Sequence, residues 1–169
     1  GHADFGSQLC QAWEDAARRA HVLGTRVVLL RTASVLAAEG GMLARLRLPF
    51  RLGLGGRLGS GRQWLPLVHL ADAVGLIDFL LWCEDCRGPY NICAPQPVRH
   101  AGFAHSLAAA LHRPACLPMP AWALRLALGD MSSLVLGGQH LLAHRAAQAG
   151  YRFHFPELDA ALRDLLARR

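Results

Sequence analysis

The chain has 169 residues, of which 53% are hydrophobic and 18% are charged. This composition indicates a globular domain rather than a disordered segment, and its high apolar content favours a protein that covers part of its surface with a partner. The net charge of +6 comes wholly from arginine, because the sequence contains no lysine. The arginines are scattered, without interleaved aromatic residues, so they suit an anionic small molecule better than a nucleic acid.

Export and membrane segments are not expected. The start of the chain lacks the basic and apolar regions of a signal peptide. Charged residues interrupt each apolar run before it reaches the roughly 18 residues that a membrane helix needs. The five cysteines are odd in number and unevenly spaced, which argues against a disulfide framework and indicates a reducing compartment. We therefore expect a cytoplasmic protein.

The first two predicted elements are a helix and a buried strand. Apolar residues recur at helical spacing over 5–23, and Gly24 stands where a helix would stop. The apolar, β-branched run over 26–31 is typical of a strand covered on both faces. Such a strand needs parallel neighbours from further βα units, and these units are not obvious in this sequence.

The following segments alternate between helical and extended patterns. We expect a short helix over 39–50 that ends before Pro49, a glycine-dense loop over 51–61, an extended segment over 62–69, a helix over 70–83 with Asp72 in its first turn, and a strand over 90–93.

Residues after Pro97 are mostly helical by pattern. We expect helices over 101–112 and 120–128, a largely helical segment over 132–149 that breaks at Gly137 and Gly138, and a final helix opened by Pro156.

A series of short motifs occurs in one order and at tight spacing. They are LLRTASVL at 29–36, GG at 40–41, PFRLGLGG at 49–56, GSGRQW at 59–64, VHLAD at 68–72, GPYN at 88–91 and PELDAAL at 156–162. Together they resemble the extended short-chain dehydrogenase/reductases, in particular the atypical, epimerase-like branch with an extra helical C-terminal domain of unknown function.

The resemblance implies an α/β fold with two parts. Residues 1–94 would be the C-terminal part of an NAD(P)-binding, Rossmann-like domain, with substrate-facing loops. Residues 95–169 would be a mainly helical C-terminal domain. The half that carries the dinucleotide fingerprint would precede this chain, so NADP or NAD is the implied cofactor and the missing N-terminal half an implied partner.

The catalytic helix of the resembling family carries a Tyr-x-x-x-Lys pair, and this chain departs from it. Gly6 stands in the tyrosine position and Cys10 in the lysine position. In the family the lysine lowers the tyrosine pKa so that proton transfer works near neutral pH, and a chain without lysine cannot assemble that pair. The resemblance makes Cys10 the candidate catalytic residue, and the alternative is a buried small hydrophobe.

Two loops are the implied binding segments. Arg31, Thr32 and Val35 follow the buried strand, and the carboxyl ends of strands are where open α/β sheets bind ligands. By resemblance they face the cofactor, and the alternative for Arg31 is a plain salt bridge.

The substrate-facing residues implied by the resemblance are Arg62, Gln63, Trp64 and His69. Arginine can clamp a phosphate or carboxylate, and tryptophan offers a stacking face. The alternative places Trp64 and His69 in the core, with His69 capping the next helix.

Other motifs in the sequence carry less weight. The glycine-dense loop lacks the lysine of a Walker motif, and Pro66 blocks the helix that should follow. Cys83 and Cys86 have zinc-knuckle or redox-pair spacing but no second pair, and His140 and His144 lack the glutamate of a zinc-protease motif. We therefore expect no metal site.

Two functions remain open from the sequence. The first is the C-terminal half of an NAD(P)-dependent, epimerase/dehydratase-like oxidoreductase that acts on a small-molecule, nucleotide-linked substrate and is inactive as this piece alone. The second is a non-catalytic, dinucleotide-sensing or protein-interaction member of the same family, of the kind called cell-division-inhibitor-like. The expected partners exclude nucleic acid and membrane and include a second copy of the chain.

Overall fold

The computed structural model describes residues 5–115, 117–122, 126, 129 and 137–167. Its helices are α1 (Phe5–Arg18), α2 (Gly41–Arg51), α3 (Leu70–Trp82), α4 (His100–Ala110), α7 (His144–Gln148) and α8 (Leu158–Ala167), with the 3-10 helix η1 (Arg19–Leu23) after α1. Its strands are β1 (Val28–Thr32), β2 (Ser34–Leu36), β3 (Trp64–Leu65), β4 (Leu67–His69), β5 (Gly88–Ile92) and β6 (Val98–Arg99). Among the described helices, none is long and apolar enough to cross a membrane.

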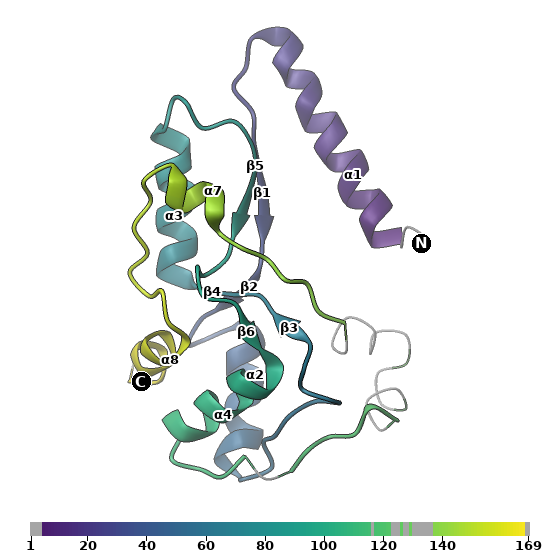
Figure 1. Cartoon of the computed structure of the whole chain (residues 1–169), viewed down its shortest axis with the longest axis vertical. Coiled ribbons are helices and arrows are strands. Elements are labelled where there is room, and N and C mark those ends of the chain that lie inside the picture. The colour runs from purple at the N-terminus through teal and green to yellow at the C-terminus, as the bar shows by residue number, and fades with distance from the viewer. Residues whose placement is uncertain (1–4, 116, 123–125, 127–128, 130–136, 168–169) are drawn as a thin grey trace.

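The upper region in Figure 1 is built on two parallel strands, β1 and β5. Their register runs from Val28 opposite Gly88 to Thr32 opposite Ile92. This confirms the strand predicted over 26–31. It also corrects the expectation about its neighbours, since one parallel neighbour lies in this chain. The crossover between the two strands includes α2 and α3, so no local pattern could reveal the pairing.

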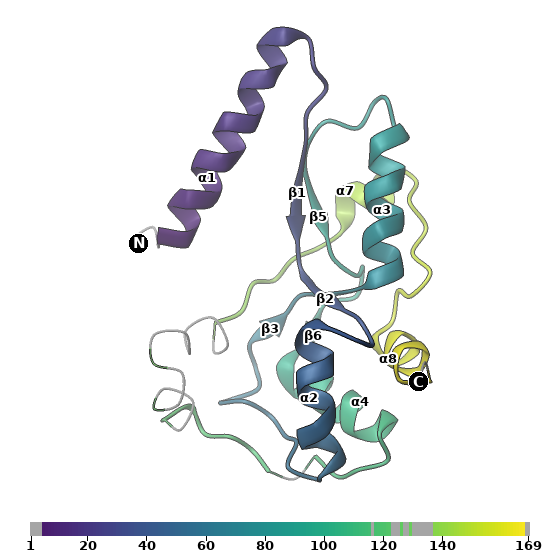
Figure 2. The same cartoon turned by 180° about the vertical axis from the view of Figure 1, so that it is seen from behind.

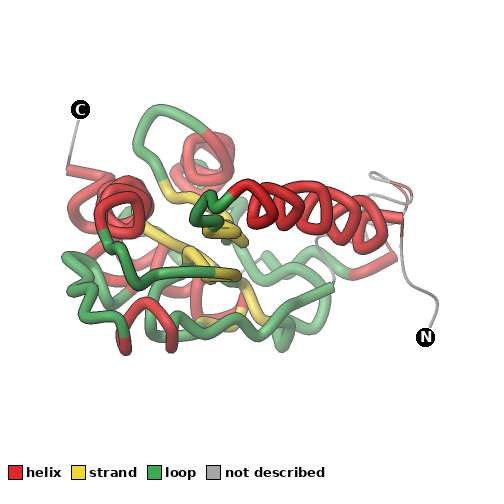
Figure 3. The backbone as a smooth tube through the Cα atoms, turned by 90° about the horizontal axis from the view of Figure 1, so that it is seen from above, coloured by secondary structure: helices red, strands yellow, loops and turns green. Residues whose placement is uncertain are grey.

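The helix predicted over 5–23 forms as α1 and η1. It ends at Gly24, whose φ of 74° is the left-handed conformation that glycine adopts without strain. α1 stands away from the body of the protein at an angle to β1 (Figures 1 and 2) and, seen from above, extends to one side of the strands (Figure 3). Leu9 and Trp13 on it are exposed. Because an amphipathic helix normally buries its apolar face, α1 lacks its usual cover within the described chain.

The lower region carries two further strand pairs and three helices. β2 and β4 are parallel, whereas β3 and β6 are antiparallel. The main chain passes from β1 into β2 through Ala33 alone, whose N–H donates to the Ile92 carbonyl. α2, α4 and α8 pack beside these strands, as seen from behind in Figure 2. β2 therefore connects the lower region directly to the β1–β5 strand pair.

Two hydrophobic cores hold the chain together. The first joins α3, β5 and α7 through buried residues that include Leu76, Ile92 and Ala146. The second joins α2, α4 and α8 through residues that include Leu43 and Leu162. Both cores contain residues from either side of position 94, and the predicted domains 1–94 and 95–169 stay a prediction.

The helix predicted to stop before Pro49 continues to Arg51, with Pro49 inside its last turn. Proline lacks the N–H that would bond to the preceding turn, but its carbonyl still accepts, here from the Leu54 N–H at 3.0 Å. Phe50 is buried in the second core. The burial of Phe50 offsets the lost hydrogen bond, so the predicted stop was wrong by one turn.

The C-terminal part agrees with the sequence only in places. The helix predicted over 101–112 is α4, while most of the helix predicted at 120–128 and the start of the segment predicted at 132–149 lie outside the described residues. Residues 137–143 are not helical. A Cβ on Gly138 would lie 2.5 Å from the backbone nitrogen of Trp64, so this segment runs close beside β3 instead of forming a helix.

The final helix begins two residues later than predicted. α8 starts at Leu158, so Pro156 precedes the helix instead of occupying its first turn. The reason is that the N–H groups of His154 and Phe155 are held by the Asp72 carboxylate, at 2.7 and 2.8 Å. This anchor keeps the preceding segment extended.

A disulfide joins Cys83 and Cys86 across the turn that follows α3. The sequence argued against a disulfide framework, and this short bridge between described cysteines differs from that expectation. The turn is also held by Arg26, which donates to the carbonyls of Leu80, Leu81 and Cys86.

Candidate cofactor and substrate site

The carboxyl end of β1 carries a two-point ion pair. Nε and Nη2 of Arg31 lie 2.6 and 2.9 Å from the two carboxylate oxygens of Glu14 on α1. Hydrogen bonding to Arg31 lowers the pKa of Glu14, and the same contact raises the pKa of Arg31. The salt bridge that the sequence left as an alternative for Arg31 is therefore present, and it ties α1 to the strand.

Cys10 belongs to the same cluster. It lies one helical turn before Glu14 and is exposed in the described chain, and its catalytic role stays a prediction. A smaller electrostatic contribution from Cys10 also raises the pKa of Arg31. Sequence reasoning missed Glu14, although its place one turn after Cys10 on the predicted helix was the available signal.

Thr32 and Val35 lie where β1 passes into β2. Thr32 is exposed and pairs in register with Ile92, while Val35 is half-buried against the first core. The Ser34 N–H donates to the Pro66 carbonyl at 3.1 Å. Thr32 therefore presents an open side chain at the carboxyl end of the strand, and Val35 presents only part of its surface there.

The Arg62 segment lies on a different strand pair, β3 with β6. Arg62 is exposed, and its carbonyl accepts from the Arg99 guanidinium at 2.7 Å. The Gln63 amide donates to the Leu58 carbonyl at 2.9 Å. These bonds fix the main chain of the segment and leave the Arg62 side chain exposed.

The Trp64 ring already has two stacking neighbours. The Arg99 guanidinium lies 4.4 Å from the ring centroid, and the His140 ring centroid lies 4.3 Å away. Such cation and aromatic contacts each stabilise a partly exposed ring by about 1 kcal/mol. A substrate ring stacking on Trp64 would share or replace these contacts. The sequence could not predict the contacts because Arg99 and His140 are far from Trp64 along the chain.

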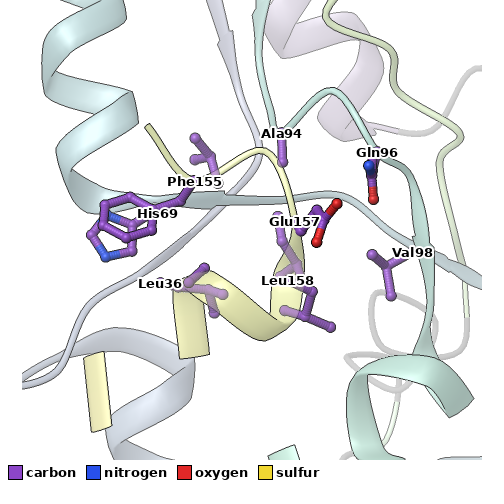
Figure 4. Close-up of a pocket in the computed structure, with 11 residues that line it drawn as sticks. Leu36, His69, Ala94, Gln96, Val98, Phe155, Glu157 and Leu158 are labelled. Atoms are coloured by element: carbon purple, nitrogen blue, oxygen red, sulfur yellow. The ribbon is translucent and has the colours of Figure 1, made fainter. Parts of the chain in front are cut away.

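His69 is buried and caps a helix. Its Nδ1 accepts from the Ala71 N–H at 3.0 Å at the start of α3, and its Nε2 lies 3.2 Å from Asp164 on α8. The ring stacks on Phe155 at 3.9 Å between centroids, as Figure 4 shows. The capping role that the sequence left open is thus observed, and a substrate contact by His69 stays a prediction.

A small cleft opens beside His69 (Figure 4). Its walls are mostly apolar, and the residues that line it include Leu36, Val98, Phe155, Glu157 and Leu158. Among the predicted site residues described in the structure, His69 is the one that lines this cleft. The cleft is therefore separate from the Arg31 and Arg62 segments.

The glycine-dense loop serves close backbone packing. Gly59 N–H donates to the Met119 carbonyl at 2.8 Å, and Met119 N–H donates to the Arg57 carbonyl at 3.0 Å. A Cβ on Gly56 would lie 2.1 Å from the Leu117 carbonyl oxygen. A strand, β3, follows the loop, so it does not open a helix as a phosphate-binding loop does.

Asp72 was predicted to serve the dipole of α3, but its main contacts are elsewhere. It is fully buried, and besides the His154 and Phe155 N–H groups it faces the Tyr151 hydroxyl, which donates to the Asp72 carbonyl at 3.1 Å. Burial, reinforced by the Asp72 charge and hydrogen bond, raises the pKa of Tyr151 to about 12. Neither a raised pKa nor this position suits a proton-transfer role at neutral pH.

Metal binding has no geometric support in the part of the chain that is described. No group of three or more His, Cys, Asp and Glu side chains there could hold an ion. His140 lies outside any helix against Trp64, so it does not share a helical face with His144.

Comparison with known proteins agrees with the fold and family that the sequence motifs indicate. Residues 119–165 match a domain family described as Domain of unknown function (DUF1731). The chain is 42% identical over 168 residues to the epimerase family protein SDR39U1 of Mus musculus, covering 99% of this chain and 57% of the mouse protein.

Two solved structures are similar throughout most of the chain. The crystal structure of human epimerase family protein SDR39U1 (isoform 2) with NADPH matches with a TM-score of 0.82 and 37% identity, over 86% of this chain and 50% of the human one. A nucleoside-diphosphate sugar epimerase from Corynebacterium glutamicum matches with a TM-score of 0.74 and 26% identity, over 94% of this chain and 30% of that one.

The parallel β1–β5 pair and its helices are the C-terminal portion of a Rossmann-like α/β domain of the short-chain dehydrogenase/reductase type. The chain belongs to the SDR39U1-like epimerase family, an atypical branch of these proteins, and corresponds to its C-terminal part. It spans about half the length of the relatives that it matches.

Proposed function

We propose that this chain is the substrate-facing half of an NAD(P)-dependent, epimerase/dehydratase-like oxidoreductase. The observation that carries the proposal is the open carboxyl end of β1, where Glu14, one helical turn after Cys10 on α1, pairs with Arg31 next to the exposed Thr32. The similarity to a protein solved with NADPH supports a dinucleotide cofactor.

The residues present fit one side of a dinucleotide. Thr32 offers a hydroxyl and Arg31 a guanidinium at the carboxyl end of a parallel strand, the usual ligand edge of such sheets. A bound NADP or NAD would supply the hydride exchange. The chain would orient the nicotinamide side and exclude water there, while phosphate recognition would fall to the preceding half. The preference for NADP over NAD rests on the named human relative.

Proton transfer in this reaction would have to use groups other than tyrosine. Tyr90 is buried beneath the Arg145 guanidinium, and the hydroxyl of Tyr151 is engaged by Asp72. Cys10 is an exposed thiol one helical turn before Glu14, which pairs with Arg31, so it is the group that we propose for this role.

The substrate that we propose is a small, anionic, nucleotide-linked molecule. The exposed Arg62 side chain and the Trp64 ring with its Arg99 neighbour combine positive charge with an aromatic face. The name of the Corynebacterium glutamicum relative supports the same substrate class.

The test uses this chain joined to the N-terminal part of its mouse relative. NADPH binding, followed by the fluorescence of the reduced nicotinamide, should weaken about tenfold in Arg31→Ala because a charge-assisted contact is lost. Cys10→Ala should keep NADPH binding and lose turnover. Unchanged binding in Arg31→Ala would refute the proposed cofactor side, and unchanged turnover in Cys10→Ala would remove the thiol from the chemistry.

A second candidate function is a non-catalytic member that binds the dinucleotide or a protein. The observation in its favour is the absence of the Tyr-x-x-x-Lys pair, since Gly6 and Cys10 occupy those positions. NADPH binding in the joined protein without turnover of any nucleotide-sugar substrate would support this candidate over the enzyme.

The expected partners follow from the uncovered surfaces. In the described chain β1 pairs only with β5, so its other edge offers unpaired main-chain groups to the N-terminal half. The same edge favours self-association when that half is absent. A cytoplasmic location remains a prediction from the cysteine pattern.

A further inference from the structure

Two stretches of the sequence that meet at one end of the molecule carry arginines and no acidic residue. Between Glu39 and Asp72 the sequence has five arginines and no acidic residue, and a second acid-free run lies between Asp85 and Asp130. The five arginines of the first run are Arg45, Arg47, Arg51, Arg57 and Arg62.

The two acid-free runs meet where α2 ends. The Arg113 guanidinium donates to the Arg51 carbonyl at 2.9 Å, and the Leu117 N–H donates to the Gly55 carbonyl at 3.4 Å. Figures 1 and 2 show this end of α2 at the opposite pole of the molecule from the β1–β5 pair and α1. We call residues 44–54 with Arg113 and Leu117 the distal tip.

The distal tip also exposes large apolar side chains. Leu48, Leu52 and Leu54 are 65%, 64% and 58% exposed, and Leu117 is 52% exposed. Single exposed leucines are ordinary, but a cluster on one surface marks a contact with something apolar. Because arginines lie among these leucines, the partner must be apolar and anionic at once.

A hollow on α2 shows where an anion would lie. It is lined by Ala44, Arg47, Leu48 and Arg51, so two guanidinium groups one helical turn apart share it. Like charges at this spacing destabilise a helix unless an anion lies between them. The Nε of Arg47 is also shielded from solvent and lacks an acceptor among the described residues.

We propose that the distal tip docks on an anionic phospholipid bilayer, with a lipid phosphate in the Arg47–Arg51 hollow and the leucines in the interfacial layer. This proposal departs from the sequence-based expectation that a membrane is not a partner. Alternating arginine and leucine on one helix face is the pattern of interfacial helices, in which arginine stems lie along the acyl boundary and their charged ends reach the headgroups. No acidic side chain of these two runs repels the surface. An acidic protein would satisfy the arginines but leave the leucines without a partner.

The test is flotation of the full chain with vesicles of phosphatidylcholine alone and of phosphatidylcholine with phosphatidylglycerol. We expect binding only to the anionic vesicles, weakened by salt and not competed by inorganic phosphate at the same concentration as the lipid. Arg47→Gln combined with Arg51→Gln should weaken binding about tenfold or more, since each cation near an anionic surface contributes about fivefold. Leu48→Ser combined with Leu52→Ser should lower it by a similar factor.

The matched control is Val74→Ser combined with Leu81→Ser on α3. These side chains are 58% and 63% exposed, but Asp78 lies between them on the same helix, so vesicle binding should not change. Circular dichroism checks that each variant is folded, and the arginine variants, which remove no packed apolar group, keep the test decisive if the leucine pair unfolds. No binding to anionic vesicles, or equal losses in tip and control variants, would overturn the proposal. Binding to polyglutamate but not to vesicles would replace the bilayer with an acidic protein.

Discussion

Helices α1 and α3 have different surroundings. α3 packs Leu76 and Leu80 into the first core, is capped by His69 and is anchored through Asp72 to the segment before α8. α1 leads through η1 into β1. It leaves Leu9 and Trp13 exposed and is held to β1 by the Glu14–Arg31 pair. One face of α3 is therefore covered within this chain, although Val74, Leu81 and Trp82 on its outer face are exposed. We infer that α1, which has no covered apolar face among the described residues, packs against polypeptide that the relatives carry before this region.

The largest expected effect comes from replacing a leucine of each helix by alanine. Leu76→Ala on α3 should lower the free energy of unfolding by about 3 kcal/mol, because a fully buried leucine leaves a cavity. Leu9→Ala on α1 should change it by less than about 0.5 kcal/mol. Urea unfolding followed by circular dichroism measures both. Similar losses at the two sites would show that α1 is packed as firmly as α3.

The next effect concerns the anchor of α3. Asp72→Ala should cost about 2 to 3 kcal/mol, since the buried N–H groups of His154 and Phe155 lose a charged acceptor. Asp78→Ala on the exposed face of the same helix is the control, and its unfolding midpoint in urea should stay close to that of the parent. If the two aspartates cost the same, the buried carboxylate does not hold the two segments together.

Alkaline pH should weaken the α3 side through Tyr151. Its pKa is raised to about 12 from an ordinary 10, so the unfolded chain ionises first and stability falls as pH rises from about 10 to about 12. Tyr151→Phe should cost about 1 kcal/mol at neutral pH and remove this part of the decline. Unfolding midpoints at several pH values measure it, and an identical decline in Tyr151→Phe would contradict the assignment.

The smallest effect is expected on the α1 side. Glu14→Gln should alter the free energy of unfolding by less than about 1 kcal/mol, because the ion pair is near the surface, yet it should raise hydrogen exchange in α1. Since the pKa of Glu14 is lowered, the pair is intact at neutral pH and is lost as pH falls through that lowered pKa. Exchange rates in α1 that do not respond to the substitution would show that another contact holds the helix.

The sequence predicted the elements better than their contacts. The strand at 26–31, the stop at Gly24 and the helix at 70–83 follow from local patterns. The pairing of β1 with β5, the Arg99 and His140 contacts of Trp64 and the Asp72 anchor join residues far apart in the chain, so no local pattern could show them. The helix through Pro49 shows how burial of Phe50 can override a local signal.

The candidate site was predicted in its residue types but not in its geometry. Arg31 pairs with Glu14, one helical turn after Cys10, and the sequence did not indicate this role of Glu14. His69 proved to be a buried cap. Trp64 lies in a separate strand pair, β3 with β6, and Arg62 comes just before it.

The most direct test of the incomplete α1 side is hydrogen exchange in this chain alone and joined to the N-terminal part of the mouse relative. The account predicts that joining protects residues 5–18 and 28–32 strongly, because β1 gains a second neighbour and α1 gains a cover, while α3 changes little. Equal exchange at 28–32 in both forms would mean that β1 needs no further strand, and this would contradict the claim that the chain is one half of a larger sheet.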